Sequence, residues 1–267
     1  MKTGCERMGD EKNLLREARL VQALRASEKI STEEAASLLG VSVSTAHRIF
    51  LSLEKKGEAV KTYGGIRAVQ PAQGEYSFER LETVRVDVKQ RIGKYAASLL
   101  EARDVVYLDN GTTASQMAIC IAALIQAGKL SGVSLFTNSL VNLNILSPVC
   151  PVNLVGGEYR PHRRDFCGYL TEETLKRLHF NKCFFSADAF DLAHGFTASD
   201  FGSARLSEIV MQNSDYRCAI VDSSKFGSRS VVTFARLEDV SLIVTDDELP
   251  PAAAAGLREL NKEIALV

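Results

Sequence analysis

Residues 31–50 read Ser31-Thr-Glu-Glu-Ala-Ala-Ser-Leu-Leu-Gly-Val-Ser-Val-Ser-Thr-Ala-His-Arg-Ile-Phe50, a stretch that predicts two short helices joined by a tight turn. Ser31 and Glu34 have the spacing of a capping box at the start of the first helix. Gly40 is expected to end that helix, because glycine adopts the left-handed conformation of a helix C-terminus without strain. Ser42 or Ser44 is then expected to cap the second helix. The residues of the second helix that are expected to be buried are Val43, Ala46, Ile49, Phe50 and Leu53.

The N-terminal end of the second helix carries polar and basic side chains. From these positions a recognition helix reaches base edges and phosphates in the major groove of DNA. We therefore interpret the stretch as a DNA-binding helix-turn-helix. The alternative is a small three-helix bundle that binds nothing, because similar patterns arise by chance. The candidate DNA-binding residues of this region are Ser42, Ser44, Thr45, His47 and Arg48.

Two neighbouring segments favour the DNA-binding interpretation. An upstream amphipathic run between residues 14 and 24 provides the third helix that a small core needs. Downstream, residues 55–67 have the pattern of a strand, a Gly-Gly hairpin tip and a second strand, which is typical of a basic wing. Lys61 and Arg67 on this wing are expected to neutralise DNA phosphates, contacts that position a protein without specifying sequence.

A chain of 267 residues predicts two domains. Pro71-Ala-Gln-Gly74 interrupts the pattern after the wing and is a plausible start for a linker. The net charge of −1 is unevenly placed, because residues 1–70 carry 12 basic against 9 acidic residues and the remainder is acidic. We expect a DNA-binding domain at 1–70, a linker and helix at 71–90, and an α/β domain that senses an effector at 91–267.

Cysteine usage and hydropathy predict where the protein works. The six cysteines form no CxxC pair and no Cys/His cluster with zinc spacing, so we expect free thiols, no metal and a reducing cytoplasm. The first ten residues mix charges without an apolar core and do not resemble a signal peptide. The longest apolar stretches, such as residues 117–125, are too short to span a bilayer, which needs about 20 residues.

From Asp104 onward, short apolar runs alternate with amphipathic segments. This alternation predicts a mostly parallel, Rossmann-like sheet with helices on both faces. Before this region, residues 78–100 are helical in pattern, and their charged part at 79–91 is expected to be solvated or to pack on a partner subunit. The expected strands are 105–108, 134–137, 152–155, 182–186, 218–221 and 241–244, and the expected helices are 113–127, 140–146, 171–178, 203–213 and 250–261.

Polar or glycine residues follow the predicted strands. The carboxyl ends of parallel strands meet at one edge of a sheet, where ligands bind, so these residues are expected to lie together. Gly111, Thr112 and Thr113 open a helix, and a helix N-terminus is a ready site for phosphate. Each position is also consistent with an ordinary cap or turn, but their convergence predicts a pocket for a small anionic polyol. The candidate effector-binding residues are Asp109, Gly111, Thr112, Thr113, Asn138, Gly156, Gly157, Arg160, Asp188 and Lys225.

The chain resembles the DeoR family of bacterial transcriptional regulators over nearly its whole length. The resemblance implies a winged helix-turn-helix joined to a sensor domain whose fold is similar to those of ribose-5-phosphate isomerase and glucosamine-6-phosphate deaminase. It also implies a repressor of a carbohydrate catabolic operon that binds double-stranded operator DNA and a phosphorylated sugar; no cofactor is expected. The motifs that carry the resemblance are Gly40-Val-Ser42, Tyr63-Gly-Gly65, Leu108-Asp-Asn-Gly-Thr-Thr113, Thr137-Asn-Ser139, Val155-Gly-Gly157, Gly168, Gly195-Phe-Thr197, Asp222-Ser-Ser-Lys-Phe-Gly227 and Val244-Thr-Asp246.

Two departures from the family pattern concern specificity. The recognition helix reads Thr45-Ala-His-Arg-Ile-Phe50 where family members usually have Thr-Ile-Arg-Arg-Asp-Leu, so an operator sequence is not carried over from relatives. In the segment Ala204–Met211, Ser207 stands where family members often have a lysine, so the usual effector is not carried over either.

The sequence leaves two alternatives to a ligand-responsive regulator. One is a regulator whose pocket has lost its ligand and serves only for oligomerisation, which the missing lysine at Ser207 would favour. The other is an isomerase-like enzyme acting on a sugar phosphate, with Asp109, Asp188 or Asp191 as general base and the N-terminal part as an accessory. A homo-oligomer is expected for a regulator, because two-fold operators require two recognition helices.

Overall fold

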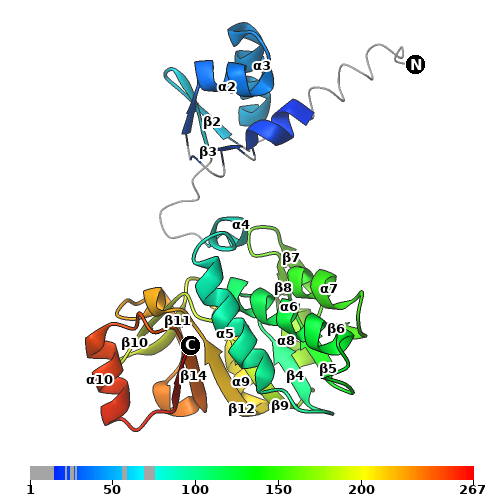
Figure 1. Cartoon of the computed structure of the whole chain (residues 1–267), viewed down its shortest axis with the longest axis vertical. Coiled ribbons are helices and arrows are strands. Elements are labelled where there is room, and N and C mark those ends of the chain that lie inside the picture. The colour runs from blue at the N-terminus through cyan, green and yellow to red at the C-terminus, as the bar shows by residue number, and fades with distance from the viewer. Residues whose placement is uncertain (1–14, 22, 25–26, 28, 56–58, 69–75) are drawn as a thin grey trace. The chain divides into compact units, whose positions relative to one another are not determined.

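The computed structural model describes every residue except 1–14, 22, 25–26, 28, 56–58 and 69–75. The chain forms two compact units, Met1–Gln73 and Gly74–Val267 (Figure 1). The predicted linker start at Pro71–Gly74 lies outside the described residues. Within the described part, no single helix is long and apolar enough to cross a membrane, and only the bent pair Thr32–Leu39 and Val43–Lys55 passes that test when taken together.

The first unit contains the two helices of the predicted helix-turn-helix, α2 (Thr32–Leu39) and α3 (Val43–Lys55), preceded by helical residues 15–21. An antiparallel sheet in the order β1-β3-β2 completes the unit, and its hairpin β2–β3 is the predicted wing. Strand β1 was not predicted from the sequence. The strands are β1 (Lys29–Ser31), β2 (Ala59–Thr62) and β3 (Gly65–Ala68).

Capping residues explain where α2 and α3 begin and where α2 ends. Ser31 and Glu34 form the predicted capping box. Gly40 ends α2 in the left-handed conformation, with a φ of 62°. Ser42 caps α3, since its hydroxyl accepts a hydrogen bond from the N–H of Thr45 at 3.3 Å. The predicted capping box and turn are therefore confirmed.

The core of the first unit is one apolar cluster shared by the helices and the sheet. The prediction was wrong for Val43, which is 47% exposed. Val43 is the first residue of α3, and its side chain lies beyond the end of the packed cluster. Upstream, Leu15 is also exposed, and Leu14 lies outside the described residues. The largest fully buried members of the cluster are Leu20, Leu24, Phe50, Leu53 and Ile66.

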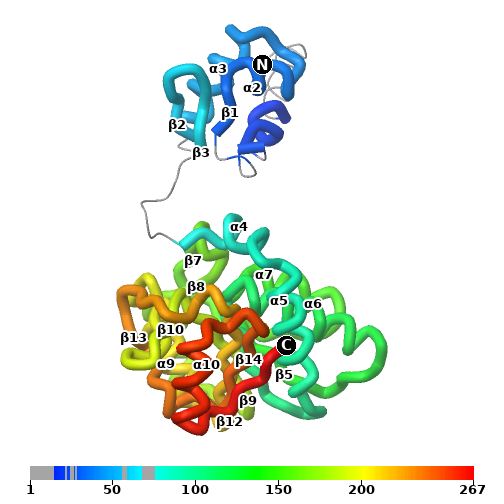
Figure 2. The backbone as a smooth tube through the Cα atoms, turned by 60° about the vertical axis from the view of Figure 1, so that its left-hand side comes forward, coloured from blue at the N-terminus to red at the C-terminus, as the bar shows by residue number. Residues whose placement is uncertain are grey.

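Seven parallel strands form the central sheet of the second unit, in the order β15-β14-β12-β9-β4-β5-β6 (Figure 1 and Figure 2). The parallel α/β architecture that the alternating pattern predicted is therefore confirmed. The strands are β4 (Val105–Leu108), β5 (Ser134–Thr137), β6 (Val152–Leu154), β9 (Phe180–Phe185), β12 (Ser214–Ile220), β14 (Leu242–Thr245) and β15 (Ile264–Leu266).

Both faces of the sheet are covered by helices, as its strand sequences require. Along β4, Val106 and Leu108 belong to the apolar cluster on one face, whereas Tyr107 belongs to the cluster on the other. Because successive side chains of a strand point to opposite faces, the apolar residues of one buried strand contribute to the cores on both faces of the sheet. The first face packs against α5 (Val86–Ser98), α6 (Thr112–Gln126) and α7 (Leu140–Leu146), and the second against α8 (Tyr169–Leu175), α9 (Phe201–Gln212) and α10 (Pro251–Glu259).

Two small antiparallel elements that the sequence analysis did not predict lie beside the main sheet. One is a hairpin of β7 (Glu158–Arg160) and β8 (Asp165–Cys167). The other is a three-stranded sheet in the order β10-β11-β13. Each of their strands has only three or four residues. The three-stranded sheet consists of β10 (Ala189–Asp191), β11 (Gly195–Ala198) and β13 (Val232–Ala235).

The helical pattern of residues 78–100 is broken into α4 (Phe78–Leu81) and α5. Arg85, with a φ of 52°, lies between them and begins α5 in a left-handed conformation. The expectation that the charged part of this segment is solvated or lies on a partner subunit was wrong for two residues. Arg85 pairs with Asp246 at 2.7 Å, and Lys89 is buried. Intramolecular carboxylates and carbonyls stabilise these charges, and sequence pattern does not reveal such partners.

Candidate functional site

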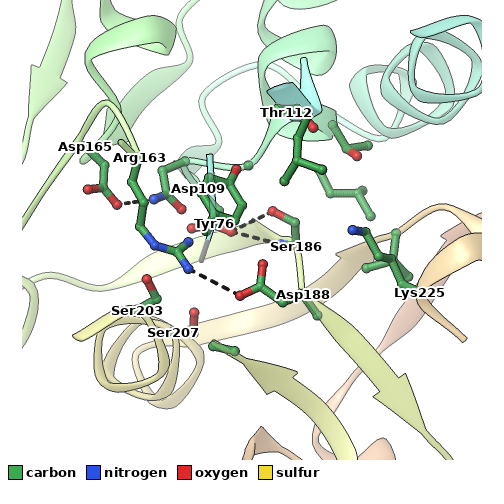
Figure 3. A pocket seen from close by; sticks show the side chains of 18 of the residues that line it. Tyr76, Asp109, Thr112, Arg163, Asp165, Ser186, Asp188, Ser203, Ser207 and Lys225 are labelled. Carbon is green, nitrogen blue, oxygen red and sulfur yellow. Dashed lines mark hydrogen bonds and ion pairs between the residues drawn. The ribbon is translucent and has the colours of Figure 1, made fainter. Parts of the chain in front are cut away.

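A pocket lies at the carboxyl edge of the central sheet, where β4 is flanked by β5 on one side and by β9 on the other. The chain order reverses direction at β4, and ligands bind at such points in open α/β sheets. Figure 3 shows side chains from separate parts of the sequence meeting there. The lining residues that follow strands are Asp109 to Thr113 after β4, Asn138 after β5, Ser186 to Asp188 after β9, and Asp222 and Lys225 after β12.

The N-terminus of α6 forms one wall of the pocket. Gly111 precedes the helix and lies so close to Ser186 that a Cβ at this position would collide with the Ser186 side chain. Gly111 offers no side-chain cap, and Thr112 and Thr113 are buried. The first N–H groups of a helix have no partner within the helix, and they carry the positive end of its dipole. This wall is therefore suited to an anion.

Two lysines face the same pocket. Lys89 reaches it from α5, and its ammonium donates a hydrogen bond to the carbonyl of Leu81 at 2.6 Å. Desolvation by burial lowers the pKa of Lys89 to about 8, although the nearby Asp222 carboxylate opposes this shift. Lys225 comes from a short 3-10 turn, and in the described part of the chain no hydrogen bond or ion pair engages its ammonium. Among the described residues that line the pocket, Lys225 is therefore a cation that is free to bind an anion.

The opposite side of the pocket is an ion-pair network centred on two arginines of the β7–β8 hairpin. Arg160 donates to Asp165 and to Asp200, in each case with a contact of 2.8 Å. Arg163 contacts Asp188 at 3.3 Å and Asp200 at 2.9 Å. Because carboxylates already engage both guanidinium groups, this side presents paired donors and acceptors rather than free charge. Such a surface is suited to the hydroxyl groups of a ligand.

Asp109 lies between these two sides, at the end of β4. Its carboxylate accepts hydrogen bonds from the N–H of Ser186 at 3.0 Å and from the Ser186 hydroxyl at 2.8 Å. Burial raises the pKa of Asp109, and the hydrogen bonds from Ser186 only partly counteract that effect. The Asp109 carboxylate thus links the residues that follow β4 and β9, and it also lines the pocket.

A second charge cluster supports the loop that carries Lys225. Asp246 follows β14 and accepts hydrogen bonds from the N–H and the hydroxyl of Ser223, both at 2.7 Å. Arg85 pairs with Asp246 at 2.7 Å and lies 3.5 Å from Asp222. Residues of α5, β12 and β14 therefore hold together the turn that presents Lys225 to the pocket.

The predicted effector-binding residues divide into two groups in the structure. Gly156 and Gly157 do not line the pocket. The Gly156 carbonyl accepts a hydrogen bond from Thr171, and a Cβ at Gly157 would collide with Thr171 and the Cys167 carbonyl, so these glycines permit a close approach of backbone segments. The residues that do line the pocket are Asp109, Gly111, Thr112, Thr113, Asn138, Arg160, Asp188 and Lys225.

Several lining residues were absent from the sequence prediction. Tyr76 and Lys89 precede the sheet in sequence, and Arg163 lies in a hairpin whose strands were not predicted. Lys89 lies beside the apolar residues Val88 and Ile92 on one face of α5, and this sequence signal could have revealed its burial. Ser207 of α9, which stands where family members often have a lysine, also lines the pocket. Its hydroxyl adds no charge to the pocket.

The second candidate surface is the N-terminal part of α3. Ser42, Ser44 and Arg48 are exposed, and Thr45 is half-buried. His47 is also half-buried, and its ring packs edge-on against Phe50 with a centroid distance of 5.7 Å. The exposed members form a polar and basic surface on one end of the helix.

The wing carries basic residues on both of its faces. Lys61 pairs with Ile66 across the hairpin, whereas Arg67 pairs with Val60. Directly opposed residues share a face and successive residues alternate, so Lys61 and Arg67 start from opposite faces. Arg67 also pairs with Lys29 of β1, and both of these side chains are exposed. The structure thus adds Lys29 to the predicted basic residues and separates Lys61 from Arg67.

The described cysteines and acidic residues do not form a metal site. Cys120, Cys150, Cys167, Cys183 and Cys218 are free thiols, and Cys5 lies outside the described residues. Among the described histidine, cysteine and carboxylate residues, no group of three or more is placed to hold a metal ion.

Comparison with solved structures gives matches to part of the chain. Ribose 5-phosphate isomerase from Methanocaldococcus jannaschii is 20% identical with a TM-score of 0.40, and the match covers 53% of this chain and 54% of that one. The chain therefore spans about half the length of that isomerase.

Sequence comparison covers both units. Residues 16–72 match the model of the DeoR-like helix-turn-helix domain, and residues 84–247 match that of the DeoR C terminal sensor domain. The chain is 29% identical to the putative aga operon transcriptional repressor of Escherichia coli O157:H7, over 94% of this chain and 93% of that protein. It is 30% identical to the lactose phosphotransferase system repressor of Staphylococcus epidermidis, over 82% of this chain and 86% of that protein. The protein therefore belongs to the DeoR family of transcriptional regulators.

Proposed function

We propose that this protein represses a carbohydrate catabolic operon, and that a phosphorylated sugar in the pocket controls its binding to operator DNA. Differential affinity of the sugar for two arrangements of a homo-oligomer would shift the DNA-binding equilibrium. The relatives named as repressors of the aga operon and of the lactose phosphotransferase system support a sugar-related operon. In this proposal residues 1–70 bind DNA, residues 71–90 form a linker and helix, and residues 91–267 sense the effector.

The observation that carries the proposal is the meeting of three positive groups in one pocket. The N-terminus of α6, the Lys89 ammonium and the Lys225 ammonium all face it, and the last of these has no ion-pair partner among the described residues. A phosphate group accepts hydrogen bonds from such donors and neutralises their charge. The Asp109 and Asp188 carboxylates and the paired arginines then lie where sugar hydroxyls need partners.

We propose that the pocket binds its ligand without transforming it. A general base needs a carboxylate that can reach a substrate proton. Asp109 is held by two hydrogen bonds from Ser186, and Asp188 accepts the N–H of Ser199 at 2.7 Å. Asp191 lies outside the pocket lining. We expect no turnover when phosphorylated pentoses and hexoses are incubated with the protein and followed by NMR. Turnover would favour the isomerase-like enzyme instead.

Titrations with DNA and sugars test the whole proposal. DNA fragments are first enriched from a random library by the wild-type protein, and a panel of phosphosugars is then added to the complex. At least one phosphosugar should weaken DNA binding and, at about 100 times its dissociation constant, stabilise the protein by about 2.7 kcal/mol. The corresponding unphosphorylated sugar should do neither. A protein that forms no sequence-preferring, salt-sensitive complex is not a repressor, and one that responds to no phosphosugar supports the alternative of an empty pocket.

Replacing Arg48 with alanine should weaken binding to the enriched DNA by about tenfold, since one base or phosphate contact contributes about 1–3 kcal/mol. Arg48 is exposed, and among the described residues it has no ion-pair partner, so the melting temperature should not change. Gel-shift titration and thermal unfolding measure the two effects. The control Arg258→Ala removes an exposed arginine of α10 and should alter neither. Unchanged DNA binding by the Arg48 variant would remove α3 from the proposed interface.

Binding of the phosphosugar should weaken by about tenfold between pH 7 and pH 9. The pKa of Lys89 is lowered to about 8, so the free protein loses this ammonium across that range, whereas a bound phosphate requires it. The charged groups that act on Lys89 are Asp222, which favours the ammonium, and Lys225 and Arg85, which disfavour it. Calorimetric titration at each pH measures the affinity. In Lys89→Gln the affinity should be lower at pH 7 and should fall less with pH. An unaltered pH profile in that variant would exclude Lys89 from the phosphate site.

A further inference from the structure

Residues 76–81, here called the strap, lie across the pocket. The strap consists of Tyr76, Ser77 and α4, and it begins the described part of the second unit. Tyr76 and Leu81 line the pocket. Figure 3 shows the Tyr76 ring among Asp109, Arg163 and Ser186, in the middle of the site. A segment that precedes the whole sensor sheet in sequence is therefore part of the pocket.

The β7–β8 hairpin anchors the strap through its backbone and an ion pair. The N–H of Phe78 donates to the carbonyl of His162 at 2.8 Å. Arg164 pairs with Glu79, also at 2.8 Å, and Phe78 is 1% exposed. The strap thus has a defined position on the sensor unit.

Two further anchors of the strap use the cations of the pocket itself. The Arg163 guanidinium lies 3.9 Å from the centre of the Tyr76 ring, a cation–π contact. The Lys89 ammonium donates to the carbonyl of Leu81. A sugar phosphate needs the Lys89 ammonium for its phosphate and the Arg163 guanidinium as a donor to its hydroxyl groups, so the ligand and the strap compete for these two groups.

The size of the pocket leads to the same conclusion. With the strap in place the cavity volume is about 50 Å³. Pockets that hold small-molecule ligands usually enclose about 300–1,000 Å³. Tyr76 occupies the centre of the site, so a sugar phosphate cannot enter fully while the ring remains there.

We propose that the strap is an internal occupant of the sensor pocket and that a phosphorylated sugar must displace it in order to bind. The inference rests on the proposed function and supplies its mode of regulation. In sequence the strap lies between the DNA-binding unit and the sensor sheet. In this proposal, release of the strap couples ligand binding to operator binding.

A tryptophan at position 76 tests the displacement directly, because the chain contains no tryptophan. In Tyr76→Trp the emission of the free protein should be that of a buried indole. Saturating ribose 5-phosphate, glucose 6-phosphate or inorganic phosphate, whichever raises the melting temperature most, should shift the emission to the red and increase quenching by acrylamide. The matched control is Tyr169→Trp, which places the indole on an exposed residue of α8 outside the pocket lining and should show no shift.

Removing the ring provides an independent measurement. Tyr76→Ala should bind the same probe at least tenfold more tightly than wild type, and the probe should release less DNA from it; Tyr76→Phe should behave like wild type. Tight binding to Tyr76→Trp without a red shift, or equal affinities for Tyr76→Ala and wild type, would show that the ligand does not displace the strap. Either result would leave the proposed sensor function intact. If no probe binds either wild type or Tyr76→Ala, both the proposed function and the proposed displacement of the strap are wrong.

Discussion

Replacing Asp246 with alanine is expected to lower the free energy of unfolding of the second unit by about 3 kcal/mol. Asp246 is fully buried, accepts two hydrogen bonds from Ser223 and pairs with Arg85 at 2.7 Å. Removing one partner of a buried ion pair costs about 3–5 kcal/mol, because the other charge is left without compensation. The lower end applies here, since Arg85 keeps Asp222 and Glu248 as partners.

Urea unfolding followed by far-ultraviolet circular dichroism measures this change. The control Asp247→Ala alters the next residue, whose side chain is 70% exposed and pairs with Arg91 only at 3.5 Å. Exposed ion pairs contribute about 0–1 kcal/mol, so this control should retain nearly all of the stability. A loss below about 1 kcal/mol in Asp246→Ala would show that the cluster is dispensable for the fold.

The contribution of Asp246 should also depend on pH. Burial raises the pKa of Asp246, but the hydrogen bonds from Ser223 and the charge of Arg85 outweigh that effect, so the pKa lies below its ordinary value of 3.8. A carboxyl group whose pKa is lowered by folding stabilises the protein above the ordinary pKa, and this contribution is lost as the pH falls through the lowered value. The difference between wild type and Asp246→Ala should therefore be constant near neutral pH and shrink below about pH 4.

Replacing Lys225 with alanine is expected to weaken phosphosugar binding by about 10- to 100-fold. A hydrogen bond to a charged group contributes about 1.5–3 kcal/mol, and in the described part of the chain no other group competes for this ammonium. Binding to DNA in the absence of sugar should be unchanged, because Lys225 belongs to the second unit. Calorimetric titration with the phosphosugar and gel shift with the enriched DNA measure the two properties.

The matched control for this variant is Lys176→Ala. Lys176 is an exposed lysine of the same unit that pairs with Glu173 outside the pocket, so its loss should leave sugar binding unchanged. Lys225→Arg keeps the charge and should retain more affinity than the alanine variant. Normal sugar binding by Lys225→Ala would place the phosphate elsewhere. A large drop in melting temperature would instead show that the lysine has a structural role.

Local chemistry explains which parts of the fold could be predicted. The capping box of Ser31 and Glu34 and the left-handed Gly40 depend on residues a few positions apart, so the sequence alone located the ends of α2. The strands β4 and β5 were predicted with their observed limits, because each is a short apolar run bounded by polar residues. The strands of the β7–β8 hairpin were missed, since Glu158–Arg160 and Asp165–Cys167 contain charged residues instead of an apolar run.

The sequence also showed which polar residues and glycines follow the strands, but not whether each of them faces the pocket. Thr112, Asn138 and Lys225 line one pocket, as expected of residues that follow neighbouring parallel strands. Gly156 and Gly157 also follow a strand, yet they serve the packing of the chain against Thr171. In both cases the sequence shows small or polar residues after an apolar strand. Whether such residues line the pocket or pack against another segment depends on which segment lies beside them in the fold.

The sequence by itself determined the two-part organisation, the helix-turn-helix and the parallel sheet with polar groups at its carboxyl edge, because capping and hydrophobic period act over a few residues. The tertiary structure alone decided that Tyr76, Lys89 and Arg163 join this edge and that Lys61 and Arg67 start from opposite faces of the wing. Such placements depend on contacts between segments far apart in the chain, and the energy of a buried charge or ring is set by those contacts rather than by neighbouring residues in the sequence.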